Sequence, residues 1–237
     1  MSSASERREE LKAVWEQARA CQRCPQLAST RNTAVFGSGN ADADLMFVGE
    51  APGANEDLQG LPFVGQAGRL LDQLLSEIGL TRADVFVANV LKCRPPGNRD
   101  PLPQEIDSCQ DYLFRQLELI QPKVVCTLGN FATKLLRDDM TGITRLHGRD
   151  ELRQVGPRVV RLYPLFHPAA ALYTPAMLAT LREDFGRIPE LLERPAPEQP
   201  EPVVEPEPDP EREPVIEEPE LVLVPPEDPG DEQLGLF

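Results

Sequence analysis

Residues 45–53 have the sequence Leu-Met-Phe-Val-Gly-Glu-Ala-Pro-Gly, in which a short apolar run passes directly into glycine, proline and one carboxylate. A short apolar run bounded by turn-forming residues is typical of a buried β-strand. Similar apolar runs occupy residues 85–90, 124–128 and 159–165. The first of these leads to Lys-Cys-Arg-Pro-Pro at residues 92–96, and the last leads to His-Pro at residues 167–168. We therefore predict four buried strands, three of which end in segments that could carry chemistry.

Segments with helical spacing of apolar residues separate these strands. They span residues 5–20, 65–78, 103–120, 130–137 and 175–192. Strands that alternate with helices predict an α/β fold, with a central, mostly parallel, four-stranded sheet that helices cover on both faces. Because ligands of such sheets bind at the carboxyl ends of the strands, we expect the active site there.

Residues 195–237 differ in composition from the rest of the chain. They contain 12 Pro, 14 Asp or Glu and one basic residue, Arg212. Such a segment has too little apolar surface to offset its chain entropy, so we predict a folded domain over residues 1–194 and a disordered tail over 195–237. The tail carries −13 of the net charge of −15, which leaves −2 for the domain. The acidic total therefore does not exclude a nucleic-acid substrate.

The sequence gives no sign of export or membrane insertion. No stretch approaches the roughly 18 apolar residues of a membrane span, and the first fifteen residues are too charged for a secretory signal. We therefore expect a cytoplasmic protein with no membrane contact. Disulfides are rare in that compartment, so the five cysteines need another explanation.

Four of the cysteines could form a metal site. Cys21 and Cys24 form a Cys-x2-Cys pair, while Cys93 and Cys109 flank a proline-rich segment. Four such thiolates suit either zinc or an iron–sulfur cluster, and the spacing does not decide between them. The alternative is that Cys93 and Cys109 are ordinary small buried residues. Cys126 lies inside an apolar run and is interpreted as a core residue.

Four segments, taken together and in this order, resemble the family 4 (iron–sulfur) uracil-DNA glycosylases of bacterial type. They are residues 49–57, 60–68, 89–99 and 167–170. The resemblance covers about residues 10–190. It implies a three-layer α/β/α sandwich, a [4Fe–4S] cluster on Cys21, Cys24, Cys93 and Cys109, and hydrolysis of the N-glycosidic bond of deoxyuridine in single- or double-stranded DNA. That reaction leaves an abasic site and begins base excision repair.

The resemblance also assigns three residues to an extruded uracil, which must leave the base stack before it can react. Phe63 would stack on the ring, although a phenylalanine is more usually a core residue. Asn89 would pair its amide with the Watson–Crick edge of uracil, although an Asn at the end of a strand could instead form a turn. His167 would donate a hydrogen bond to the uracil O2, where negative charge develops during cleavage.

Carboxylates and backbone amides complete the expected pocket. Glu50 would stabilise the cationic sugar or orient water, and Glu56 is a second candidate for that role or a wall against the methyl group of thymine. The backbone of Gly49, Ala51 and Gly53 would approach the base and phosphate closely.

The chain departs from the family pattern after the His-Pro motif. Relatives usually continue with two leucines and an arginine, whereas this chain has Ala171-Leu172-Tyr173. We assign the DNA wedge, which fills the gap left by the flipped base, to Leu172, with help from Tyr173. A related group forms a covalent adduct through a histidine in the loop at residues 94–101, but that loop has no histidine here. The second histidine, His147, is interpreted as a surface-loop residue.

The last five residues resemble the bacterial sliding-clamp-binding motif. In that motif a glutamine makes polar contacts while leucine and phenylalanine fill an apolar pocket, which here assigns Gln233, Leu234, Leu236 and Phe237 to a partner. We therefore expect a monomeric glycosylase, associated with the nucleoid, whose tail recruits it to a clamp. The alternatives are a glycosylase of the same superfamily with broader specificity for deaminated bases, and a non-catalytic iron–sulfur module that binds DNA.

Overall fold

The computed structural model describes residues 3–200. Its central sheet has six strands in the order β1-β3-β2-β4-β6-β5. The strands are β1 (Ser38–Gly39), β2 (Leu45–Gly49), β3 (Val85–Asn89), β4 (Val124–Leu128), β5 (Glu151–Val155) and β6 (Arg158–Leu165). The helices are α1 (Ala4–Ala20), α2 (Pro25–Thr30), α3 (Ala54–Gln59), α4 (Gln66–Glu77), η1 (Pro96–Asn98), α5 (Pro103–Ile120), α6 (Asn130–Arg137), α7 (Ile143–Leu146), α8 (Pro168–Ala171), α9 (Pro175–Gly186) and α10 (Ile188–Glu193).

The four predicted strands are confirmed as β3, β2, β4 and β6, which pair in parallel at the centre of the sheet. The prediction of a four-stranded sheet was wrong in number, because β1 and β5 add one antiparallel edge strand at each side. Strand β1 has only two residues, and β5 has charged residues and exposed positions, so neither produces the apolar run of a buried strand.

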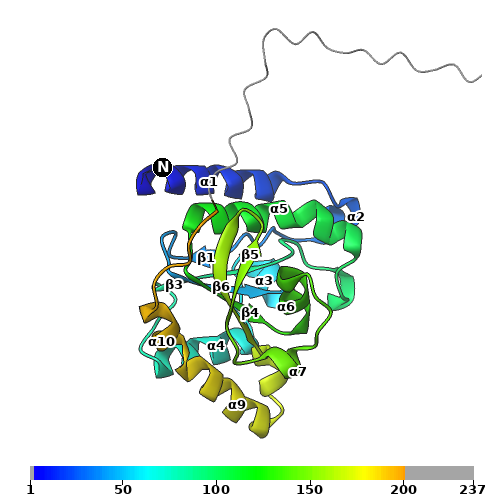
Figure 1. Cartoon of the computed structure of the whole chain (residues 1–237). Coiled ribbons are helices and arrows are strands. Elements are labelled where there is room, and N and C mark those ends of the chain that lie inside the picture. The colour runs from blue at the N-terminus through cyan, green and yellow to red at the C-terminus, as the bar shows by residue number, and fades with distance from the viewer. Residues whose placement is uncertain (1–2, 201–237) are drawn as a thin grey trace, which may run out of the picture. The chain divides into compact units, whose positions relative to one another are not determined.

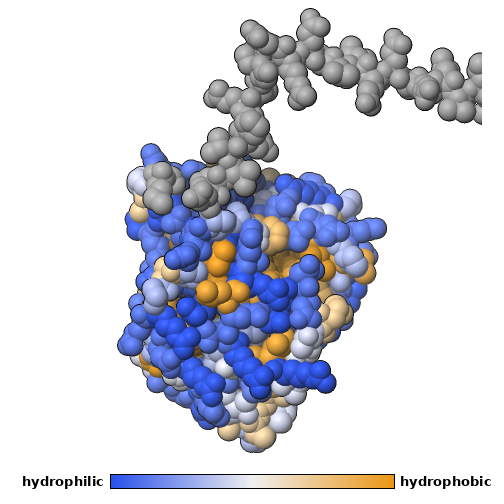
Figure 2. Space-filling view, viewed as in Figure 1, coloured by the Kyte–Doolittle hydropathy of each residue, from blue (hydrophilic) through white to orange (hydrophobic). Residues whose placement is uncertain are grey.

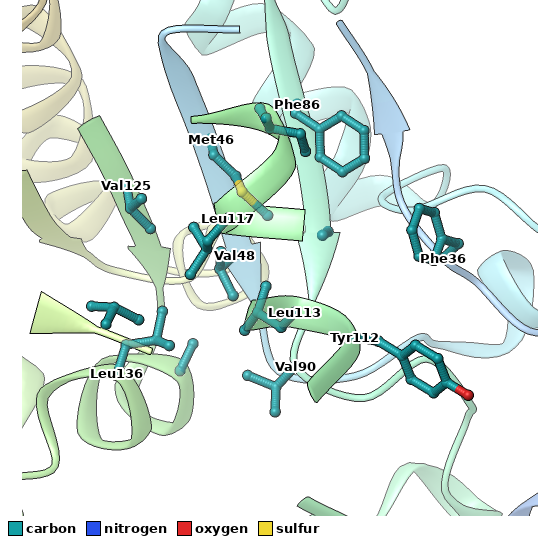
Figure 3. Packing of buried hydrophobic residues seen from close by; sticks show 14 of the residues in the cluster. Phe36, Met46, Val48, Phe86, Val90, Tyr112, Leu113, Leu117, Val125 and Leu136 are labelled. Carbon is teal, nitrogen blue, oxygen red and sulfur yellow. The ribbon is translucent and has the colours of Figure 1, made fainter. Parts of the chain in front are cut away.

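Helices cover both faces of the sheet, which confirms the three-layer sandwich (Figure 1). Alternate side chains of β2 point to opposite faces, as the period of two in a strand requires. Met46 and Val48 pack in a core with residues of α5 and α6 (Figure 3). Residues of α1 belong to the same core. Leu45 and Phe47 pack in a second core with α4, α9 and α10. Two separate cores of this kind are what an α/β/α sandwich needs to bury both sheet faces.

The helix predicted over residues 175–192 is two helices. Helix α9 ends at Gly186, and α10 follows with Pro189 in its first turn. A proline inside a continuous helix would lack one hydrogen bond and would collide with the carbonyl four residues earlier, so the helix breaks before it.

One face of the structure is mostly polar, and Gln199 contacts the sheet. Hydrophilic residues cover most of the face in Figure 2, and apolar groups reach it only in a few patches. No helix within residues 3–200 is both long and apolar enough to cross a bilayer. The side-chain amide of Gln199 exchanges two hydrogen bonds with the backbone of Val159, at 3.1 and 2.8 Å. The domain boundary at residue 194 stays a prediction, and the clamp-like motif lies outside the described residues.

Candidate active site

The site is built where β2 and β3 end side by side. Gly49 and Asn89 are direct partners in the parallel register. A Cβ atom at Gly49 would lie 2.4 Å from Oδ1 of Asn89 and 2.7 Å from Cζ of Phe63. Only glycine therefore allows these two side chains to meet at this point. The structure thus brings together three residues that the sequence predicted for the pocket.

Asn89 is buried, yet its amide is unused. No hydrogen bond joins its side chain to another residue within 3–200, while its backbone oxygen accepts a bond of 2.8 Å from Nζ of Lys92. Within residues 3–200 the enclosed side-chain atoms without a partner belong to Arg137 and Arg158, so the amide atoms of Asn89 reach the open space of the site. Asn89 therefore has a fixed backbone and a side-chain amide that is free to form hydrogen bonds with a ligand.

Phe63 and His167 face one another across the site. Their ring centroids are 5.6 Å apart with an interplanar angle of 27°. Phe63 is 7% exposed and has a φ of 54°, which is unusual for a bulky residue. The backbone of Phe63 is therefore held by its surroundings in a conformation that the residue itself disfavours, at a typical cost of about 1–3 kcal/mol.

His167 is held as a neutral hydrogen-bond donor. The backbone N–H of Ala169 donates to Nδ1 of His167 over 3.1 Å, so the ring proton of the neutral imidazole lies on Nε2. Burial lowers the pKa of His167 to about 4, although the charge of Glu56 acts in the opposite direction. Gly129 makes room for the imidazole, because a Cβ atom there would lie 3.1 Å from Cβ of His167.

Glu50 lines a cavity of about 730 Å³ together with His167. The cavity extends from these two residues along α6 and past its carboxyl end to Met140, and neither Phe63 nor Asn89 lines it. Burial raises the pKa of Glu50, and the nearby Asp100 raises it further. A carboxylate thus faces the space beside the Phe63–Asn89 pocket, where a sugar or a water molecule could lie.

The remaining predicted pocket residues, Glu56, Gly53 and Ala51, contact the backbone or the core. Oε1 of Glu56 accepts hydrogen bonds from the backbone N–H groups of Val64 and Gly65, at 2.9 and 3.0 Å. Glu56 therefore holds the loop that follows Phe63. Gly53 allows Glu56 to approach, since a Cβ atom there would lie 2.7 Å from Oε2. Ala51 is partly buried against the first core.

The proposed wedge segment follows α8. Leu172 is partly buried against the second core, whereas Tyr173 is 82% exposed. The side chain that projects into solvent from this segment is therefore the tyrosine.

The four predicted ligand cysteines line one small enclosed cavity, on the α1–α5 side of the sheet. Cys126 is buried in β4 within the second core, as predicted. Nη1 of Arg31 lies 3.0 Å from Sγ of Cys93, and the backbone N–H of Lys92 lies 3.3 Å from Sγ of Cys109. Burial raises the pKa of Cys93 and raises that of Cys109 to about 11. Within residues 3–200, no three histidine, cysteine or acidic residues are gathered closely enough for a single metal ion.

Several residues of the site were not found from the sequence. Lys92 is buried beneath Asn89 and also donates to Oε1 of Gln116 over 2.6 Å. His147 is no simple surface residue, because its Nδ1 lies 2.8 Å from Oδ2 of Asp184 and its ring lies 4.5 Å from that of Phe166. Phe166 directly precedes His167, so the ring of His147 packs against the segment that carries His167. The contacts of Lys92 with Gln116 and of His147 with Asp184 join segments that are distant in the chain, so no local sequence signal marks them.

Comparisons with known proteins agree with this geometry. Residues 36–188 match the model of the Uracil DNA glycosylase superfamily. The chain is 46% identical to a type-4 uracil-DNA glycosylase of Sulfurisphaera tokodaii, over 76% of this chain and 84% of the relative. It is 45% identical to a type-4 uracil-DNA glycosylase of Archaeoglobus fulgidus, over 77% of this chain and 94% of the relative. A type-4 uracil-DNA glycosylase of Thermotoga maritima is 42% identical, over 70% and 85%. This chain therefore belongs to the type-4 family of the uracil-DNA glycosylase superfamily.

Proposed function

We propose that this protein is a uracil-DNA glycosylase, which hydrolyses the N-glycosidic bond of deoxyuridine in DNA and thereby initiates base excision repair. The observation that carries the proposal is that Asn89 and Phe63 meet at Gly49 while the ring of His167 stacks against that of Phe63. The type-4 uracil-DNA glycosylases to which the chain is similar support the same activity.

The first step is extrusion of the uracil, which costs a few kcal/mol. Phe63 would offset part of this cost by stacking on the extruded ring, since stacking of a base on an aromatic side chain contributes about 1–3 kcal/mol. Leu172 would occupy the vacated space in the duplex, and the exposed Tyr173 beside it supports a contribution from that side chain.

Asn89 would select uracil. The N3–H of uracil can donate to Oδ1 of the amide, and O4 of uracil can accept from Nδ2. Cytosine presents the opposite pattern on these two positions. The absence of an intramolecular partner for the amide within residues 3–200 leaves both groups available for this readout.

His167 and Glu50 would carry the bond cleavage. The Nε2–H of a neutral His167 can donate to the uracil O2 as negative charge develops there, which lowers the barrier. Glu50, in the adjoining cavity, would orient water or stabilise positive charge on the sugar. Glu56 would act indirectly, because its carboxylate holds the Phe63 loop. The backbone of Gly49, Ala51 and Gly53 would frame the base.

We also propose that Cys21, Cys24, Cys93 and Cys109 hold a [4Fe–4S] cluster. The donor set fits, since four thiols share one enclosed cavity and two N–H donors point at their sulfurs, as is common around iron–sulfur clusters. A cluster is larger than one ion, so its ligands need not gather around a point. When bound, it would stabilise the packing of the amino-terminal segment on α5, and it takes no part in the cleavage steps above.

The tail would serve recruitment. We propose that Gln233, Leu234, Leu236 and Phe237 bind a DNA sliding clamp, on the basis of the sequence motif alone. The protein would then be a cytoplasmic monomer that is associated with the nucleoid.

A base-release assay tests the activity directly. Single- and double-stranded oligonucleotides containing uracil, hypoxanthine, xanthine or mismatched thymine should release base only, or fastest, from uracil. Equal release of hypoxanthine or xanthine would favour the broader deaminated-base glycosylase. No release of any base by protein that still binds DNA would favour the non-catalytic module.

A further inference from the structure

We infer that Arg82, which lies outside the pocket, is the positioning residue that holds Phe63 in its stacking orientation; the inference rests on the proposed role of Phe63 in uracil recognition. Arg82 lies in the connection between α4 and β3. None of the family motifs quoted above contains it, and it does not line the catalytic cavity.

The reason that Phe63 needs a brace is its backbone. A φ of 54° is strained for a side chain of this size, and such a conformation persists only when neighbouring groups impose it. The ring is also confined, because Gly49 lies on one side and His167 on another. A small rotation of the Phe63 backbone would therefore displace the ring from the site.

Arg82 supplies the restraint on the carbonyl side of the loop. Nη2 of Arg82 donates to the backbone oxygen of Phe63 over 2.9 Å, and Nη1 approaches the oxygen of Pro62 at 3.4 Å. Nε of the same guanidinium pairs with the carboxylate of Asp72 on α4. The planar guanidinium thus fastens two successive carbonyls of the loop to the helix that follows it.

The opposite side of the loop is held independently. Glu56 accepts hydrogen bonds from the N–H groups of Val64 and Gly65. Gly68, in the first turn of α4, lies so close that a Cβ atom there would be 1.7 Å from the oxygen of Phe63. Glu56 accepts from the N–H groups, and the lack of a side chain at Gly68 leaves room for the carbonyl of Phe63. Arg82 is the only side chain within residues 3–200 that donates to that carbonyl.

A double-mutant cycle distinguishes positioning from general stabilisation. Single-turnover release of uracil is measured for wild type, Arg82→Ala, Phe63→Ala and the double variant. Loss of a charged hydrogen-bond donor should slow Arg82→Ala by roughly 10-fold. In the Phe63→Ala background the same change should cost less than about 2-fold, because the ring that Arg82 positions is gone. Equal losses in both backgrounds, or no loss in either, would overturn the inference.

The chain offers a matched control in Arg182. Like Arg82, Arg182 pairs with a carboxylate of α4, in this case Glu77. The side chain of Arg182 is 43% exposed and that of Arg82 is 32% exposed. Arg182 has no contact with the Phe63 loop among its hydrogen bonds. Arg182→Ala should therefore leave uracil release within about 2-fold of wild type.

A spectroscopic measurement keeps the test independent of activity. The protein is labelled with 4-fluorophenylalanine at its nine phenylalanines, and the resonance that disappears in Phe63→Leu is assigned to Phe63. Arg82→Ala should shift this ¹⁹F resonance and leave most others in place. The milder Asp72→Asn should move it in the same direction, while Arg182→Ala should not move it. If the Phe63 resonance does not move in Arg82→Ala, the inference about Arg82 is refuted, whether or not the protein releases uracil. Absence of uracil release by the wild-type protein would instead refute the proposed function.

Discussion

The backbone N–H of Ala169 donates a hydrogen bond to Nδ1 of His167, and this single contact determines which ring nitrogen carries the proton. The proton lies on Nε2, and burial keeps the ring neutral by lowering its pKa to about 4. A neutral donor can approach a developing anion without first paying the cost of burying a charge. The arrangement makes His167 suited to stabilise a leaving uracil.

Replacement of His167 by alanine should therefore slow single-turnover cleavage by roughly 10²–10³, the scale for one preorganised donor to an oxyanion. Binding of uracil-containing DNA should change little, since phosphate contacts dominate affinity. Quenched-flow cleavage and fluorescence anisotropy measure the two quantities separately. Equal losses in both would mean that His167 positions DNA instead.

The pH profile should reflect the neutral histidine. Because the pKa of His167 is lowered to about 4, its ring stays neutral as the pH falls through 6.5, and half of the rings are protonated only near pH 4. Any acid limb above that range should come from Glu50, whose pKa is raised by burial. Single-turnover rates between pH 4 and 8 should thus show no step at pH 6.5 that depends on His167. A step there that His167→Gln abolishes would contradict the neutral-donor assignment.

Asn89→Asp should weaken the recognition of uracil and admit cytosine, since the acid or carboxylate offers the ring edge a different hydrogen-bond pattern. Loss of one buried readout contact should cost on the order of 1–3 kcal/mol. Single-turnover rates on uracil and cytosine substrates measure the change. Unchanged uracil kinetics would remove Asn89 from the pocket.

Cys109→Ala should abolish the broad absorption near 400 nm that is general to [4Fe–4S] proteins, and should lower the melting temperature, because cluster binding is coupled to folding. Cys21→Ala should behave in the same way. Cys126→Ala is the control, since Cys126 is buried in the other core. Loss of colour in Cys126→Ala together with its retention in Cys109→Ala would show that the ligand set is wrong.

Deletion of residues 233–237 should leave turnover on short oligonucleotides unchanged and abolish pull-down by a bacterial sliding clamp. The double change Leu236→Ala and Phe237→Ala should act alike, because these side chains would form the apolar anchor. Unimpaired clamp binding by that variant would show that the motif does not mediate clamp binding. A large loss of activity on short oligonucleotides would indicate that the tail contributes to the catalytic domain.

The sequence by itself determined the central architecture. Apolar runs flanked by glycine and proline predicted the four parallel strands, since each lies in the buried centre of the sheet where hydrophobic burial decides every position. The edge strands β1 and β5 escaped prediction because one is short and the other faces solvent. Gly49 and Asn89 were recognised as motif residues, but only the parallel register shows why a glycine must stand opposite that amide.

Tertiary structure alone decided how the site is held. Three features of the site depend on contacts between residues that are separated along the chain. They are the positive φ of Phe63, the hydrogen bonds of Arg82 and Glu56 to its loop, and the packing of His147 against Phe166. Local patterns record burial and turn formation, because those act through neighbouring residues. They do not record which distant donor meets which acceptor, because that is fixed only when the sheet and helices pack together.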